Sequence, residues 1–210
     1  MEKEFWYQRW QNNQIGFHLG TTNPLLVKFF KRLELHANAR VFVPLCGKTR
    51  DIPWLLSRGF EVVGVELSPL AVEQFFEELG VKATRREDGP HFRYTSHQLT
   101  IFQGDIFDLT PKSLGRVDAV YDRAALVALP PPMRHRYTQH LIELTHKAPQ
   151  LLLTFDYDQS KKEGPPFSVG EDLVRGEYGA VYTIELLHRK QLRDGLGGVS
   201  QAEECVWHLS

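Results

Sequence analysis

A short loop and one carboxylate have the residue types and spacing to hold a nucleoside. The loop, residues 43–48, reads Val-Pro-Leu-Cys-Gly-Lys, and its single glycine cannot form the G-x-G-x-x-G turn that lets a diphosphate approach backbone N–H groups. Glu66 ends the next apolar run, about 20 residues after Gly47, where an acidic side chain can accept both hydroxyls of a ribose. The loop can present the backbone of Gly47 to a ligand, but it has no cradle for phosphates. Recognition of a ribose at such a site favours S-adenosylmethionine as cofactor. A solvated carboxylate at a strand end is the alternative.

Two further side chains follow strand-like runs and have two interpretations each. Asp105 can accept a hydrogen bond from an adenine amino group while Ile106 packs on the ring, or Asp105 can cap a helix. Arg123 can pair with the carboxylate of a cofactor or with an anionic acceptor. Its other interpretation is a surface ion pair with Asp122, which contributes little to stability. The residues alone leave both pairs of alternatives open.

The N-terminal stretch is rich in aromatic residues. Trp6 and Trp10 lie one turn apart on a predicted helix. They either pack on a sheet or belong to a lid that folds over the cofactor and excludes water.

Other reactive side chains point to no further chemistry. The histidines at 135, 140 and 146 lack the i, i+4 spacing of a metal-binding helix, so no metal is predicted. Cys46 has no evident partner histidine and is expected to be a small buried residue. Neither a G-x-S-x-G elbow nor a Walker loop occurs in the sequence.

Composition excludes several classes of protein. The 210 residues are 42% hydrophobic and 24% charged, which is typical of a globular chain. The formal net charge of -1 provides no general attraction for nucleic acid. No apolar run approaches the roughly 18 residues of a membrane helix, and the N-terminus does not resemble a signal peptide. With only two cysteines, the chain is expected in a reducing cytoplasm.

Apolar runs alternate with helical patterns through the middle of the chain. One such helix follows Ser68, a good N-cap, and ends at Gly80. Continuous apolar strands separated by helices indicate an α/β fold with a parallel sheet covered on both faces. We predict a mostly parallel seven-stranded sheet whose last two strands form an antiparallel edge. The predicted strands are 40–43, 61–66, 99–102, 118–121, 151–155, 180–187 and 203–209.

The domain organisation expected from this pattern is simple. The polar segment 82–97 is interpreted as a surface insertion and not as a linker. We therefore predict one domain over residues 1–210, in which residues 1–35 form a helical lid over the cofactor.

Five motifs in order resemble the thiopurine S-methyltransferase family over nearly the whole chain. They are VFVPLCGK (41–48), VVGVE (62–66), DIFDL (105–109), YDRAALVAL (121–129) and GPPF (164–167). The resemblance implies a Rossmann-like class I methyltransferase fold that uses S-adenosylmethionine.

The resemblance also assigns roles to individual residues. It implies cofactor binding by Trp10, Leu45, Glu66 and Arg123, with further contacts from Trp6 and from the backbone around Asp105 and Ile106. Phe17 matches an aromatic residue that faces the substrate. A second arginine on the substrate side is expected near the glycine-rich segment 192–198, and Arg193 is the candidate. Arg123 is also the candidate catalytic residue, because it can favour an anionic acceptor.

The expected reaction is in-line transfer of a methyl group to the sulfur of a small thiol of thiopurine or aromatic type. Selenium or tellurium species and halides are soft nucleophiles that the same fold can serve, and they form the first alternative. The second is a protein that binds S-adenosylmethionine without catalysis. A monomer that acts on xenobiotic or metabolic thiols, with no nucleic-acid or membrane partner, is the expected form.

Overall fold

A computed structural model describes residues 3–210, so Met1 and Glu2 of the predicted lid lie outside the described residues. The chain forms two compact units, Met1–Ala119 and Val120–Ser210. The single domain expected from the sequence stays a prediction.

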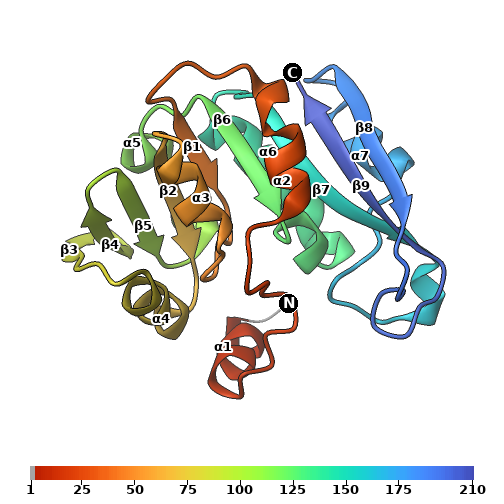
Figure 1. Cartoon of the computed structure of the whole chain (residues 1–210), viewed down its shortest axis with the longest axis horizontal. Helices are drawn as coiled ribbons and strands as arrows, with labels where there is room; N and C mark the ends of the chain where they lie inside the picture. The colour runs from red at the N-terminus through yellow and green to blue at the C-terminus, as the bar shows by residue number, and fades with distance from the viewer. Residues whose placement is uncertain (1–2) are drawn as a thin grey trace. The chain divides into compact units, whose positions relative to one another are not determined.

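The first unit contains a sheet in which β1, β2 and β5 run parallel (Figure 1). β4 pairs antiparallel with β5, and β3 pairs antiparallel with β4, which gives the order β3-β4-β5-β2-β1. The central strand β2 is almost entirely buried, as its continuous apolar sequence predicts. The strand bounds are β1 Arg40–Val43, β2 Glu61–Glu66, β3 Thr84–Asp88, β4 His91–Ser96 and β5 Leu99–Gln103.

Strands β3 and β4 correct two predictions. The segment interpreted as a surface insertion is a hairpin that extends the sheet, and residues 3–210 therefore contain nine strands in place of the predicted seven. The edge strand β3 is exposed along most of its length, so it carries charged residues and lacks the apolar alternation that marks a strand. Arg85 instead packs over the ring of Phe92, 3.7 Å from its centroid.

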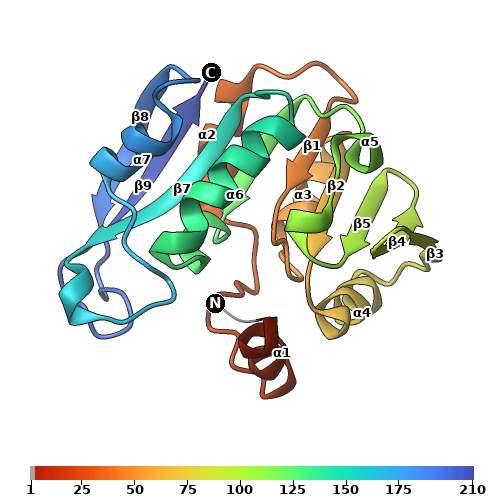
Figure 2. The same cartoon turned by 180° about the vertical axis from the view of Figure 1, so that it is seen from behind.

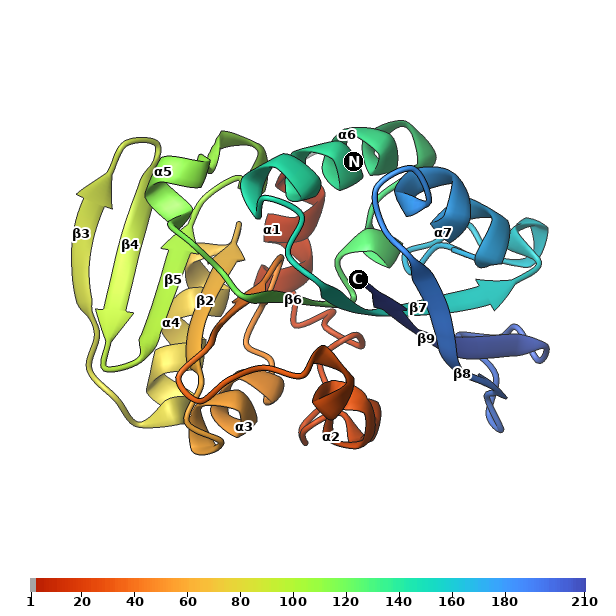
Figure 3. The same ribbon diagram turned by 90° about the horizontal axis from the view of Figure 1, so that it is seen from above.

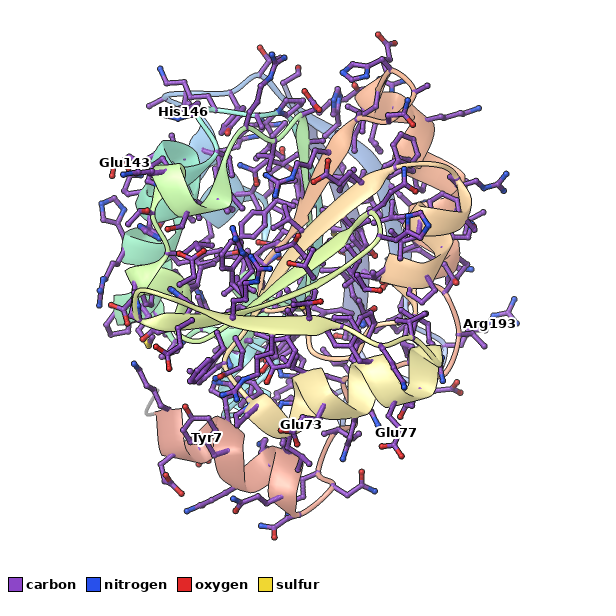
Figure 4. The ribbon with its side chains drawn as sticks, turned by 90° about the vertical axis from the view of Figure 1, so that its left-hand side faces the viewer. Tyr7, Glu73, Glu77, Glu143, His146 and Arg193 are labelled. Atoms are coloured by element: carbon purple, nitrogen blue, oxygen red, sulfur yellow. The ribbon has the colours of Figure 1, made fainter. Side chains whose placement is uncertain are left out.

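The helices of the first unit begin where the sequence supplies caps. The Ser68 hydroxyl accepts the Ala71 N–H at the start of α4, and Gly80 ends α4 with φ 70°, as predicted. Figure 3 shows α3 and α4 on the same face of the sheet, and Figure 4 shows α1, with Tyr7, beside α4, with Glu73 and Glu77. The bounds are α1 Lys3–Gln11, α2 Pro24–Phe29, η1 Phe30–Leu33, α3 Asp51–Ser57, α4 Pro69–Leu79, η2 Ile106–Asp108 and α5 Pro111–Leu114.

The second unit contains strands in the order β6-β7-β9-β8. β6 and β7 are parallel, whereas β9 pairs antiparallel with both β7 and β8. This confirms the predicted antiparallel edge. The strands are β6 Ala119–Arg123, β7 Gln150–Tyr157, β8 Ile184–Gln191 and β9 Ala202–Leu209.

Helices α6 and α7 lie on one face of these strands (Figure 2). Their side of the sheet carries buried polar contacts, such as the Trp207 indole N–H that donates to the Thr154 hydroxyl at 2.9 Å. The helix bounds are η3 Leu126–Ala128, α6 Pro131–Leu144, η4 Gln159–Lys161 and α7 Glu171–Tyr178.

Candidate functional site

The carboxylate of Glu66 joins two loops at the carboxyl end of β2. Its Oε2 accepts the Gly47 N–H at 2.8 Å, and its Oε1 accepts the Ser68 N–H at 2.8 Å. The residue is only 6% exposed, so it is not the solvated carboxylate of the alternative interpretation. Burial raises the pKa of Glu66, and the hydrogen bonds that its carboxylate accepts from backbone N–H groups oppose this increase.

Glu66 retains the capacity to bind a ligand with two hydroxyls. Each carboxylate oxygen has two lone pairs and uses one for a backbone N–H at 2.8 Å, and the Leu67 N–H adds a smaller contribution. The remaining pairs suit the two hydroxyls of a ribose, so the residues present fit the nucleoside half of S-adenosylmethionine.

The loop after β1 has an unusual backbone. Leu45 adopts φ 46° and Gly47 adopts φ 52°. A left-handed conformation is unfavourable for a bulky residue such as leucine and typically occurs at functional sites. The Cys46 N–H donates to the Val65 carbonyl at 3.0 Å, which fixes the loop against β2. Cys46 is buried, as expected, and burial raises the pKa of its thiol well above the usual range.

The aromatic residues predicted from the N-terminus come together over this loop. The rings of Trp6 and Trp10 each contact Phe17 edge-on, at 5.8 and 5.7 Å between centroids. Trp10 is buried, and its Cζ2 would lie 3.2 Å from a Cβ placed on Gly47. The glycine therefore allows close contact between the loop and the indole.

Asp105 caps the turn after β5 and also holds α1. Its side chain accepts the Phe107 N–H at 3.0 Å and forms an ion pair with the Lys3 ammonium at 2.9 Å. The capping interpretation is therefore confirmed, while a contact with adenine stays a prediction. Ile106 is buried beside it.

His91 supports this turn, a role that no motif around His91 predicts. Its Nε2 donates to the Asp105 carbonyl at 2.8 Å, and a Cβ on Gly104 would lie 2.5 Å from the His91 ring. The only sequence signal for this contact is Gly104 itself, because His91 belongs to the hairpin that the polar composition concealed.

In the second unit, a buried carboxylate shapes the turn after β6. Asp122 is fully buried, and it accepts the Tyr137 hydroxyl at 2.7 Å and the Leu126 N–H at 3.2 Å. Burial raises the pKa of Asp122 to about 6. Within residues 3–210, Asp122 forms no ion pair with Arg123, which excludes that interpretation of the arginine. Arg123 is half-buried and precedes Ala124, which has φ 66°.

Arg193 lies in the turn after β8 and is exposed. Figure 4 shows its side chain extending away from the molecule. Its predicted role on the substrate side gains no support from this placement.

The structure contains little that would support metal chemistry. Among the described residues, no group of three or more His, Cys, Asp or Glu side chains is arranged to hold a metal ion. His135 and His146 are exposed on α6 or just beyond it, as expected for a solvated helix face. Within the same residues, no helix combines the length and the apolar character needed to cross a membrane.

Comparison with known proteins gives consistent matches over the full length. A family model described as Thiopurine S-methyltransferase (TPMT) matches residues 1–209. A thiopurine S-methyltransferase of Xanthobacter autotrophicus is 56% identical over 210 residues, which covers 100% of this chain and 99% of the relative. One from Gluconobacter oxydans is 47% identical, covering 98% of this chain and 94% of the relative.

Solved structures share the fold at low sequence identity. The 1,6-didemethyltoxoflavin-N1-methyltransferase of Burkholderia thailandensis, with 1,6-didemethyltoxoflavin and S-adenosylhomocysteine bound, aligns with a TM-score of 0.66 and 13% identity. The alignment covers 99% of this chain and 86% of that one. A TehB-like S-adenosylmethionine-dependent methyltransferase of Corynebacterium glutamicum aligns with a TM-score of 0.57 and 14% identity, covering 99% and 98%.

The contact between Gly47 and Trp10 can be tested with Gly47→Ala. Gly59→Ala is the matched control, since Gly59 has φ 83° but nothing within 4 Å of a new Cβ. Both variants should lose about 1–2 kcal/mol of stability from the left-handed backbone. Only Gly47→Ala should shift the tryptophan fluorescence, because only there does the new methyl group meet an indole. Identical spectra for the two variants would contradict this packing.

The buried Asp122 predicts a specific dependence of stability on pH. Its pKa of about 6 exceeds the ordinary 3.8, so the folded state binds the proton more tightly than the unfolded state. This contribution to stability is complete below about pH 4 and is lost as pH rises through about 6, with a size on the order of 3 kcal/mol. In Asp122→Asn that loss should be absent from unfolding curves measured between these pH values. The exposed Asp172→Asn should behave like wild type; equal pH dependence in all three proteins would refute the assignment.

Proposed function

The chain belongs to the thiopurine S-methyltransferase family, and from this premise we propose that it methylates the sulfur of small thiols of thiopurine or aromatic type. It is an S-adenosylmethionine-dependent methyltransferase with a Rossmann-like class I fold. The observation that carries the proposal is the buried Glu66 carboxylate, which has unused lone pairs beside a loop without a phosphate cradle. That arrangement suits a nucleoside that is not attached to a diphosphate.

The proposed cofactor contacts follow the site residues predicted from the sequence. Glu66 accepts the ribose hydroxyls, and the backbone from Leu45 to Gly47 lies along the nucleoside. Asp105 and Ile106 provide the adenine contact. The Asp105 side chain also accepts the Phe107 N–H and pairs with Lys3. The tryptophans of α1, Trp6 and Trp10, exclude water from this end of the sheet.

The chemistry requires alignment more than activation of the donor. S-adenosylmethionine supplies a methyl group on a sulfonium that already carries its leaving group. The protein residues must hold donor and acceptor in line and keep water out, which can lower the barrier by roughly 7–11 kcal/mol. Arg123 meets an anionic group, either the donor carboxylate or the ionised acceptor, and Phe17 is proposed to face the acceptor. Arg193 is retained only as a candidate for the acceptor side.

A thiol is the preferred acceptor because the full-length relatives carry the name thiopurine S-methyltransferase. Selenium or tellurium species and halides remain the alternative acceptors on the same fold. A non-catalytic S-adenosylmethionine-binding protein is the alternative from another class. We further propose a cytoplasmic monomer that detoxifies xenobiotic thiols.

The acceptor class can be determined with a labelled methyl donor. Wild-type protein should label a thiopurine and a simple aromatic thiol faster than selenite, tellurite or iodide, because those thiols ionise near neutrality. Labelling only of the selenium, tellurium or halide acceptors would replace the thiol proposal with the alternative. Calorimetric binding of the donor without turnover of any acceptor would favour a binding protein.

A further inference from the structure

Strand register in the second unit brings charged and aromatic residues from four strands to one place. Arg123 of β6 is paired with Leu153 of β7, and two residues further along β7 Phe155 is paired with Glu204 of β9. Glu204 is paired in turn with Lys190 of β8. Residues paired across strands, and residues two apart on one strand, point to the same side of a sheet. Arg123, Phe155, Glu204 and Lys190 therefore share one face.

Glu203, the residue before Glu204, points to the opposite face of the sheet. Glu203 lies 3.8 Å from the guanidinium of Arg189, which also forms an ion pair with Glu171 of α7 at 3.3 Å. Glu203 therefore faces the helices, and Glu204 faces away from them. The two adjacent glutamates provide a matched pair, with one in an ordinary salt-bridge network and the other on the Arg123 face.

The Glu204 carboxylate has no partner that accounts for its burial. Glu204 is half-buried, and within residues 3–210 no hydrogen bond or close ion pair engages its oxygens. Burial raises its pKa, while the charges of Arg123 and Lys190 act in the opposite direction. A carboxylate that loses hydration without gaining a hydrogen bond reduces stability, which is a common property of groups retained for function.

An apolar wall adjoins this carboxylate. Phe155, Leu192 and Leu196 are partly buried and pack on a small core of Tyr157, Val199 and Ala202. The glycine-rich turn makes this possible, because Gly195 has φ 65° and a Cβ there would lie 2.3 Å from the Val199 carbonyl oxygen. The segment 192–198 therefore packs its two leucines on the same small core as Phe155. An apolar surface beside a carboxylate suits an aromatic ring that carries an acidic hydrogen.

We propose that Glu204 is a catalytic base that removes the proton from an aromatic thiol lying against Phe155, Leu192 and Leu196. This role rests on the proposed function. The S–H bond breaks, its proton passes to the Glu204 carboxylate, and its electron pair forms the new bond from sulfur to the methyl carbon. The pair from the broken methyl–sulfonium bond stays on the sulfur of the donor. In the thione tautomer of a heterocyclic thiol, the proton is taken from the ring N–H instead. The proton then leaves Glu204 for water, so no further reagent is needed.

The charged and titratable groups on this face determine the pH at which the base acts. They are Arg123 from β6, Tyr157 from β7, His208 from β9, and Lys190, His188 and Glu185 from β8. Because the pKa of Glu204 is raised, the carboxylate gains its proton and ceases to act as a base at a higher pH than an ordinary glutamate. Wild-type kcat/KM should therefore decrease as the pH is lowered below neutrality.

Glu204→Gln tests this role, with Glu203→Gln as the matched control on the opposite face. The variants should be assayed on a series of aromatic and benzylic thiols of increasing pKa. For thiols whose pKa lies about two units above the assay pH, Glu204→Gln should reduce kcat/KM by about 100-fold or more, the usual contribution of a general base. For thiols that are already ionised it should reduce kcat/KM by less than about threefold, since these need no base. The acid limb of the pH profile should also disappear, whereas Glu203→Gln should match wild type throughout.

A rescue experiment distinguishes a base from a structural residue. Acetate or formate added to Glu204→Ala should restore turnover of the weakly acidic thiols, and calorimetry should give unchanged affinity for S-adenosylhomocysteine. A loss that is equal for all thiols and is not rescued by acetate or formate would overturn the proposal, as would wild-type rates in Glu204→Gln. Absence of thiol turnover in the wild-type protein would instead remove the proposed function itself, and with it this role.

Discussion

The proposed cofactor site depends on one interaction. The buried Glu66 carboxylate accepts hydrogen bonds from two backbone N–H groups, those of Gly47 and Ser68. Gly47 and Ser68 lie on different loops, and each donates to a separate oxygen of the same side chain at 2.8 Å. Hydrogen bonds to a charged group of this kind contribute about 1.5–3 kcal/mol each, which offsets part of the cost of burying the charge, and burial still raises the pKa of Glu66. They also hold the strained loop around Leu45 in place, so that Trp10 can pack on Gly47. The left-handed backbone of Leu45 would be unfavourable in an isolated peptide. It is maintained here by the Glu66 carboxylate, which still has lone pairs for a ligand.

The second unit uses a buried acid differently. Asp122 is satisfied by the Tyr137 hydroxyl and by backbone N–H groups, so it shapes the turn after β6 and has a structural role. Arg123, the next residue on the strand, points to the other side of the sheet, where Glu204 also lies without a partner among the described residues. Alternation along β6 and β9 therefore places Asp122 and Glu203, which have hydrogen-bond or ion-pair partners, on one side of the sheet and Arg123 and Glu204 on the other. Burial alone does not distinguish these roles; the distinction comes from whether the hydrogen-bonding capacity of a buried group is used.

The sequence predicts those parts of the fold that have local causes. Apolar runs identify the parallel strands, and Ser68 and Gly80 mark the ends of α4 because capping is a property of neighbouring residues. The sequence predicts a surface insertion where the hairpin of β3 and β4 lies, because an exposed edge strand needs no apolar alternation. Glu66 is recognisable from its place after an apolar run. Glu204 is not recognisable in this way, because its position beside Arg123 depends on strand register between segments far apart in the chain. Two adjacent glutamates in the sequence also do not indicate which one faces the helices.

The most direct test of the account compares the affinity of the protein for S-adenosylhomocysteine with its affinity for the 2′,3′-dideoxy analogue, in wild type and in Glu66→Gln. If the unused lone pairs of Glu66 accept the sugar hydroxyls, the wild-type protein should bind the natural nucleoside about tenfold or more tightly than the analogue. The variant should show much less discrimination, because one of the two acceptor oxygens is gone. Equal affinity of the wild-type protein for both compounds would contradict the claim that this carboxylate recognises the ribose.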